Sequence, residues 1–317
     1  MSRQFYSRQP PALVAVFVGI VLVLMGCATP QVSQLRQHWP ADMPVVAALK
    51  NVPFFPQEDY ECGPASLAMM FQAAGVNARP EQLVQQVYIP GRQGSLQVEL
   101  LAASRRHGLM AYRLTPVLED LLREVAAGHP VLVFENLSLP IYPVWHYAVV
   151  VGFDRDRNIL VLHSGKTEAL EMSLFTFERT WVRGGNWAIV VLPPNRLPVT
   201  ADADAFAQSA AALELADARA AHIAYATALK RWPDHKALLL GLGNTDYALG
   251  RLADAASAYQ AAVQVHADFA DGWNNLAQVQ MELGRHQEAA DAIAKAVTLG
   301  GPRLARYLEL AQTIQAK

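Results

Sequence analysis

The residue best suited to covalent chemistry is Cys62, one of only two cysteines among 317 residues. It lies at the border between the polar segment "QEDYE" and the apolar run "GPASLAMMF". This border predicts a helix that begins close to the cysteine, and a helix N-terminus stabilises a thiolate through its unpaired N–H groups and partial positive charge. Cys62 is therefore a candidate nucleophile rather than only a packing residue.

A nucleophilic thiol needs a base and hydrogen-bond donors for the oxyanion, and the sequence offers a candidate for each. His146 stands in "VWHYAVVVGF", at the start of an apolar segment. A lone histidine there is more often a core residue that hydrogen bonds the backbone, but together with Cys62 it is a candidate general base. Gln57 lies five residues before Cys62, so its amide and the Cys62 backbone N–H are predicted to form a two-donor oxyanion hole.

The elements that must position these residues are helices first and strands second. A helix is expected from about Gly63 to Ala74, ended by Gly75, and a second one after Gly94 with Ser95 as its N-cap. "LEDLLREVAAGHP" predicts a third helix, and the strands "VLVFENL", "WHYAVVVGF", "NILVLHS" and "NWAIVVLPP" follow it. This order predicts an α+β domain with an antiparallel sheet over residues 49–197.

The remainder of the chain, residues 200–317, is an alanine-rich helical segment with an internal repeat. A shift of 34 residues superimposes "LGR" at 249–251 on "LGR" at 283–285, together with paired alanines. The pattern resembles the tetratricopeptide repeat, in which small and aromatic positions let two helices cross closely. Three units are expected, at about 202–235, 236–269 and 270–303, followed by a capping helix. Repeats of this kind predict a concave surface for a protein partner or a substrate segment.

Two motifs together indicate a family. "Q-x4-C-G-P-A-S-L-A-M" and "H-Y-A-V-V-V-G-F" resemble the bacteriocin-processing, double-glycine type of papain-like cysteine peptidase, in particular its exported lipoprotein relatives fused to tetratricopeptide repeats. The resemblance covers about residues 49–195. It implies a papain-like α+β fold in which Cys62 is the nucleophile, His146 the general base and acid, and Gln57 the oxyanion donor.

One position departs from that family, which normally places Asp or Asn on the next strand to orient the histidine. This chain has "LVLHSG" there, with His163 placed 17 residues after His146 and Ser164 beside it. A neutral His163 is a weak candidate orienter, because it lacks the charge of a carboxylate. A zinc site of Cys62, His146 and His163 has no supporting CxxC or HxxxH spacing. No metal or cofactor is therefore expected.

The N-terminus predicts export and attachment to a membrane. Residues 1–11 are basic without acids, an uncharged apolar stretch of 15 residues follows, and "LMGC" ends at Cys27. This resembles a lipoprotein signal peptide over 1–27, which implies lipidation of Cys27; the alternative is a plain N-terminal membrane anchor. Ala28 resembles the residue of lipoproteins released to the outer membrane. Residues 28–48 are interpreted as a linker that lifts the folded part off the membrane.

The leading interpretation is a lipid-anchored cysteine peptidase of the bacterial cell envelope that faces the periplasm. Its formal charge is 26 minus 28, or −2, without a basic stripe, so nucleic acid is not an expected partner. The expected partners are a peptide or protein substrate, a protein bound by the repeats, and the membrane through the lipid on Cys27. Two alternatives stay open: a papain-like cell-wall amidase, and a catalytically weak peptide-binding scaffold, which the "LHSG" departure favours.

Overall fold

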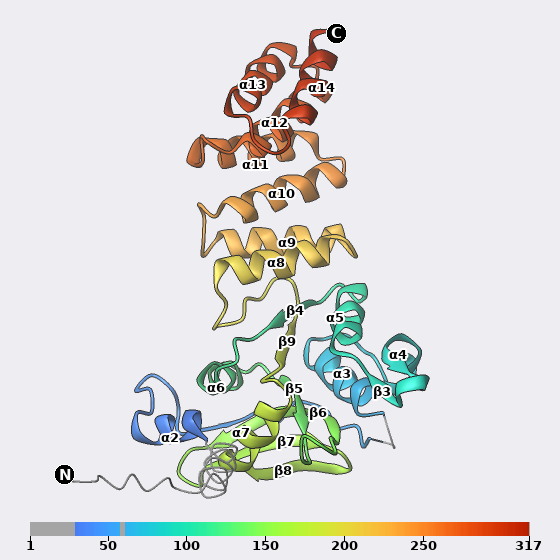
Figure 1. Cartoon of the computed structure of the whole chain (residues 1–317), viewed down its shortest axis with the longest axis vertical. Helices are drawn as coiled ribbons and strands as arrows, with labels where there is room; N and C mark the ends of the chain where they lie inside the picture. Colours follow the sequence, from blue (N-terminus) through green and yellow to red (C-terminus); the bar gives the residue numbers. More distant parts are fainter. Residues whose placement is uncertain (1–28, 58–60, 317) are drawn as a thin grey trace, which may run out of the picture.

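A seven-stranded antiparallel sheet is the centre of the N-terminal part of the protein (Figure 1). The computed structural model describes residues 29–57 and 61–316. The strand order is β4-β9-β5-β6-β7-β8, and β1 pairs with the far end of β6. The strands are β1 (Val46–Ala48), β4 (Met110–Arg113), β5 (Val131–Asn136), β6 (Trp145–Asp154), β7 (Ile159–Ser164), β8 (Thr167–Ser173) and β9 (Ala188–Leu192).

Helices cover both faces of this sheet, so the strands are buried on two sides. The helices α3 (Cys62–Ala73), α4 (Pro80–Val87) and α5 (Gln97–Arg106) pack on one face. The helices α2 (Pro30–Gln37), α6 (Leu118–Ala126) and α7 (Leu174–Arg183) pack on the other. Strand β6 serves both cores by alternation: Tyr147, Val149 and Val151 face α3, whereas Ala148 and Val150 face α6 and α7. The α+β fold predicted from the sequence is thus confirmed.

Helix α3 carries Cys62 as its first residue and is buried almost completely. Residues 63–71 are all buried, which agrees with the continuous apolar run in the sequence. The helix ends before Gly75, whose φ of +86° is the left-handed conformation that glycine adopts most easily. The helix thereby fixes the cysteine at the end of a rigid element.

The N-terminal segment corrects one expectation. A linker over 28–48 was expected, but the described part of it folds onto the sheet as α2 and β1. Val32 and Leu35 are spaced to share one helix face and are buried in the core. The buried carboxylate of Glu178 accepts hydrogen bonds from the backbone N–H groups of Gln31 and Val32, which are free at the start of the helix. Two apolar residues in an otherwise polar segment are therefore sufficient to anchor this segment to the core of the sheet domain.

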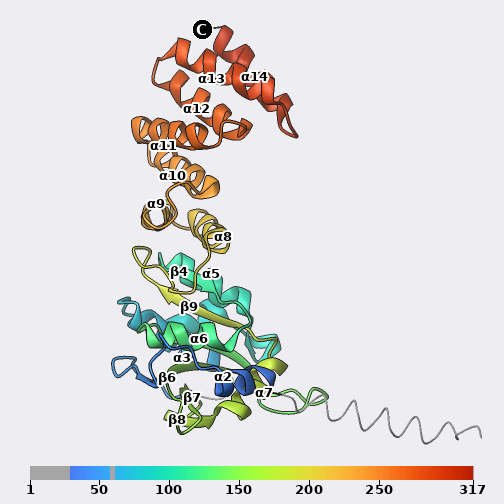
Figure 2. The same ribbon diagram turned by 90° about the vertical axis from the view of Figure 1, so that its left-hand side faces the viewer.

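The C-terminal part is a stack of paired helices that rises from the sheet (Figures 1 and 2). The pairs are α8 (Ala203–Glu214) and α9 (Ala218–Leu229), α10 (Lys236–Ala248) and α11 (Leu252–Val265), and α12 (Ala270–Glu282) and α13 (His286–Leu299), with α14 (Leu304–Gln315) as the last helix. These pairs match the three units and the capping helix predicted from the sequence. A Cβ atom at Gly241 would lie 2.2 Å from the ring of Tyr225, so the close helix crossing there requires glycine.

The repeats and the sheet share one core. Phe206 of α8 packs against Tyr112 of β4, with ring centroids 6.4 Å apart, and both belong to the core under α6 and α7. Thr200 donates to the buried carboxylate of Glu124 through its N–H and its hydroxyl. The repeats are therefore packed on the sheet rather than joined to it by a loose linker.

Two sequence-based expectations concern the membrane. The signal peptide over 1–27 and the lipidated Cys27 lie outside the described residues. Within 29–57 and 61–316, none of the helices combines the length and the apolar character that crossing a membrane requires.

Candidate active site

The thiol of Cys62 lies where the start of α3 meets the start of β6. Backbone hydrogen bonds from Tyr147, from Gly63 and from Cys62 itself favour the thiolate. Burial has the larger and opposite effect, and it raises the pKa of the Cys62 thiol above its ordinary value. The cysteine is free and partly buried. Its contact with the backbone of Tyr147 places the sulfur beside the residue that follows His146.

His146 lines the same pocket as Cys62. Its Nε2 lies 2.9 Å from the hydroxyl oxygen of Ser164 on β7. Burial lowers the pKa of His146 to about 4, since the charged ring loses its hydration. The pKa shifts of the two groups act together: at neutral pH they favour a thiol beside a neutral imidazole over a thiolate–imidazolium pair.

Gln57 also lines this pocket, but its amide already has partners. Its Nε2 donates to Ser66 Oγ at 3.2 Å and to the carbonyl oxygen of Tyr147 at 3.3 Å. Its Oε1 accepts from the N–H of Gly165. These bonds hold the side chain beside the cysteine and occupy both amide protons, so an oxyanion could be bound by Gln57 only after one of them is released.

His163 does not lie in the orienter's place that the sequence led us to expect. Its Nε2 is 3.2 Å from the carbonyl oxygen of Val52, and its Nδ1 accepts from the N–H of Ala169. Both ring nitrogens thus have other partners, and the neighbouring Ser164 is the residue that contacts His146. The difference follows from strand alternation, because adjacent residues of β7 point to opposite faces of the sheet.

The pocket around Cys62 and His146 has a volume of about 770 Å³. One wall is the stacked pair of Trp145 and Phe134, whose ring centroids are 5.2 Å apart. The lining also includes Ser95, which was expected to cap a helix but lies in β3 (Gly94–Ser95). A Cβ atom at Gly63 would lie 2.3 Å from Ser95 Oγ, so only glycine fits after the cysteine. The remaining lining comes mainly from residues 92–97, 143–144 and 165–166.

Sequence reasoning missed several members of this site. The backbone N–H of Tyr147 has no signal in the sequence, because any residue type provides it. Ser164 was visible only as the neighbour of His163, and strand alternation would have been the clue to choose between them. Ser95 was expected to be an N-cap because it begins a helical pattern, whereas α5 begins two residues later and Leu96 is its N-cap.

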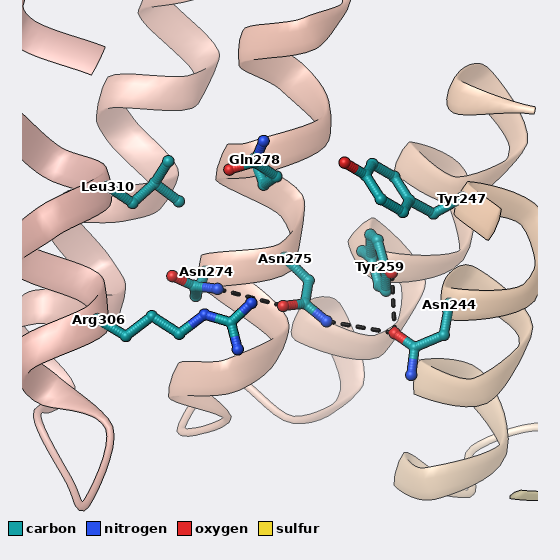
Figure 3. A pocket seen from close by; sticks show the side chains of 8 residues that line it. All are labelled: Asn244, Tyr247, Tyr259, Asn274, Asn275, Gln278, Arg306 and Leu310. Carbon is teal, nitrogen blue, oxygen red and sulfur yellow. Dashed lines mark hydrogen bonds between the residues drawn. The ribbon is translucent and has the colours of Figure 1, made fainter. Parts of the chain in front are cut away.

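A second pocket lies among the repeats and has a volume of about 460 Å³ (Figure 3). It is formed mainly by the first helices of successive units and by α14. Three asparagines form a ladder in which Asn274 donates to Asn275 and Asn275 donates to Asn244. Arg306 of α14 completes the lining and forms no salt bridge within the described part of the chain. The other lining residues are Tyr247, Tyr259, Gln278 and Leu310.

The comparisons with protein families agree with this division of the chain. Residues 49–189 match the Peptidase_C39 like family, and residues 206–264 and 240–303 match the tetratricopeptide repeat. The chain therefore contains a C39-like peptidase domain followed by a tetratricopeptide-repeat region. No curated protein matches this chain.

Solved structures similar to the first part of the chain are C39-type domains. A putative C39-like peptidase from Bacillus anthracis is 22% identical, with a TM-score of 0.39, over 46% of this chain and 97% of its own. The peptidase domain of Streptococcus ComA is 20% identical, with a TM-score of 0.38, over 45% of this chain and 99% of its own. A double-glycine motif protease from an AMS/PCAT transporter, solved with a leader peptide, is 24% identical, with a TM-score of 0.35, over 46% of this chain and 93% of its own.

The pKa shifts of Cys62 and His146 predict a steep pH dependence of thiol reactivity. A stable ion pair would keep the alkylation rate by iodoacetamide nearly constant over the neutral range. With the pKa of Cys62 raised and that of His146 lowered to about 4, the rate should instead rise continuously. It should be about tenfold lower at pH 7 than at pH 8, since the thiolate fraction changes tenfold per pH unit below the thiol pKa. Intact-mass measurement of the alkylation rate checks this, and a plateau between pH 5 and 8 would contradict it.

Proposed function

We propose that the protein is a cysteine peptidase in which Cys62 and His146 act as a pair. The observation that carries this proposal is the placement of both side chains in one pocket, with the Tyr147 backbone bound to the sulfur. The match to the Peptidase_C39 like family over residues 49–189 supports the reaction class.

The reaction proceeds in two halves. His146 takes the Cys62 proton while the sulfur attacks the amide carbon, and the C–N bond breaks as the amine leaves with the proton from His146. Water then gives a proton to His146 and attacks the thioester, which releases the acid and restores the thiol. Two donors serve the oxyanion: the backbone N–H of Cys62, and the amide of Gln57 once it has left one of its present partners.

The surroundings of the pocket favour an apolar peptide segment as the substrate. Large apolar side chains are exposed in the loop between β5 and β6 and at the start of β6: Ile141 is 76% exposed, Tyr142 75% and Trp145 52%. Trp145 and the loop residues Pro143 and Val144 line the pocket. Such side chains gain most from contact with apolar residues of a bound peptide. A muropeptide, which is richer in polar groups, would use this surface less well.

A catalytically weak peptide-binding protein is the second candidate, and specific observations favour it. Gln57 donates to protein partners rather than into the pocket. The pKa of about 4 makes His146 a weak base at neutral pH. Under this alternative the same apolar pocket binds a peptide without cleaving it.

Hydrolysis by matched variants distinguishes these candidates. We expect the full-length protein to cleave members of a mixed-sequence peptide library. Cys62→Ala should abolish cleavage, and His146→Ala should lower kcat/KM by about 100-fold or more, the usual contribution of a general acid–base group. His38→Ala, which changes an exposed histidine far along the chain, is the control and should have no effect.

Three other outcomes of this experiment assign the function differently. Binding without cleavage by the wild type would favour the scaffold. Cleavage of muropeptides but not of peptides would favour the amidase. Cleavage that persists in Cys62→Ala would exclude the proposed nucleophile.

We further propose that the pocket of Figure 3 recruits an extended peptide that carries a carboxylate. Asn244 accepts from Tyr259 and Asn275 through its Oδ1, which leaves its amide N–H groups for a peptide carbonyl. Arg306 offers a guanidinium without a salt bridge in residues 29–57 and 61–316, and guanidinium binds carboxylate in a bidentate manner. The match to the tetratricopeptide repeat supports a role in protein interaction.

Peptide arrays test this recruitment. Among random decapeptides, those with a free C-terminal carboxylate should bind better than the same peptides with a C-terminal amide. Arg306→Met should remove that difference, about tenfold in Kd for one charge-assisted contact. Arg303→Met, at the N-cap of the same helix, is the matched control, because Arg303 already pairs with Asp271. Equal binding of acids and amides by the wild type would contradict the proposal.

Finally, we propose that a lipid on Cys27 tethers the protein to the bacterial cell envelope on the periplasmic side, at the outer membrane. Only the lipobox-like sequence and Ala28 support this step. A clickable palmitate analogue fed to expressing cells should label the wild type, and Cys27→Ser should lose the label. Equal labelling of both would exclude this anchor.

A further inference from the structure

The site as described lacks a negative charge next to His146. Ser164 bonds the ring nitrogen, but a hydroxyl does not stabilise an imidazolium as a carboxylate does. Burial penalises the same imidazolium. A proton acceptor in this position needs a compensating charge from elsewhere, and the proposal below rests on the proposed pairing of Cys62 with His146.

A buried carboxylate lies directly across the sheet from His146. In the antiparallel pairing of β5 with β6, Glu135 and His146 are Cα partners. Residues opposite one another in such a pair project from the same face, with Cβ atoms about 4.5–5.5 Å apart. Glu135 is completely buried. Strand β6, which carries His146, lies between β7 with Ser164 and β5 with Glu135. Strand β5 thus provides an acid next to His146.

The contacts of Glu135 leave one of its oxygens available. Its Oε1 accepts from the hydroxyl of Thr180 on α7, while the buried Oε2 has no hydrogen-bond partner in the described part of the chain. The end of α7 lies tightly against this strand, since a Cβ atom at Gly184 would lie 2.1 Å from the carbonyl oxygen of Phe134. A buried carboxylate oxygen without a hydrogen-bond partner destabilises the folded state. Its presence therefore indicates a role other than packing.

We propose that Glu135 is a positioning residue for His146, whose carboxylate stabilises the imidazolium that forms when His146 takes the Cys62 proton. No covalent step involves Glu135. It acts through its charge, which favours the protonated ring during thiol attack and during water activation. It thereby supplies from β5 the charge that the "LHSG" sequence of β7 does not provide.

The ionisation of Glu135 gives this role a recognisable pH dependence. Burial raises the pKa of Glu135 to about 7, and the nearby charge of Arg183 on α7 acts in the opposite direction. Arg183 is the charged group that lowers the pKa of Glu135, and His146 is its Cα partner across the strand pair. Below pH 6 Glu135 is largely protonated and contributes no charge, whereas at pH 8 it is largely ionised.

The test is the pH profile of kcat/KM for acylation of Cys62 by an activated peptide ester, in wild type and in Glu135→Gln, which keeps the shape of the side chain and a polar contact to Thr180. We expect equal values at pH 5.5 and about tenfold slower acylation of the variant at pH 8, since an opposite charge at this range shifts the pKa of a base by about one unit or more. A purely structural role would change both rates in the same proportion or only the Tm. Superimposable profiles would overturn the proposal.

Two further variants keep the test decisive if Glu135→Gln folds poorly. Arg183→Met removes the charge that lowers the pKa of Glu135 and should move the step in the wild-type profile to higher pH. Ser164→Asp places a carboxylate on Nε2 of His146 and should rescue Glu135→Gln far more than it stimulates the wild type. An unmoved step, or equal stimulation of both backgrounds, would also overturn the proposal.

Failure of the proposed Cys62–His146 pair gives a different result. In that case His146→Ala is acylated by the ester at the wild-type rate, and the role of Glu135 falls with it. If His146→Ala is slow but Glu135→Gln behaves as wild type, only the role of Glu135 is excluded.

Discussion

The contact on which this structure depends is that between the N-terminus of α3 and the first residues of β6. The Tyr147 backbone binds the Cys62 sulfur, and the Tyr147 carbonyl oxygen accepts from Gln57 and Ser66. The start of β6 thus contacts the thiol and Gln57 through Tyr147, and it carries His146 as the residue before Tyr147. The requirement for glycine at position 63 comes from a second close approach, that of α3 to β3, because Ser95 occupies the space of a side chain.

The site combines tight burial with little charge, and this combination defines its chemistry. Desolvation raises the pKa of Cys62, lowers that of His146 to about 4 and raises that of Glu135 to about 7. Each shift favours the neutral form. A pair that is neutral at rest can still transfer a proton once substrate has excluded water, provided that a negative charge supports the imidazolium. The repeats, which share a core with the sheet, are fixed relative to this site.

The sequence was sufficient for the fold and for three residues that line one pocket, Gln57, Cys62 and His146, but not for their contacts. The apolar run after Cys62 and the 34-residue spacing predicted α3 and the paired helices correctly, since both patterns are local. The linker was predicted wrongly, because Val32 and Leu35 are buried in a core formed by residues distant in the sequence, and because the distant Glu178 accepts from the backbone at the start of their helix. The choice between His163 and Ser164 depends on strand register and on a bulge in the pairing of β6 and β7. The pairing of Glu135 with His146 is likewise a property of register, which no local pattern encodes.

The central claim, that Cys62 and His146 transfer an acyl group together, is tested most directly by rapid-quench mass spectrometry with an activated peptide ester. The account predicts that the wild type gains one acyl group on Cys62 and then loses it by hydrolysis, whereas His146→Ala acylates slowly and retains the adduct. Absence of an adduct on Cys62, or identical formation and loss in both proteins, would contradict it.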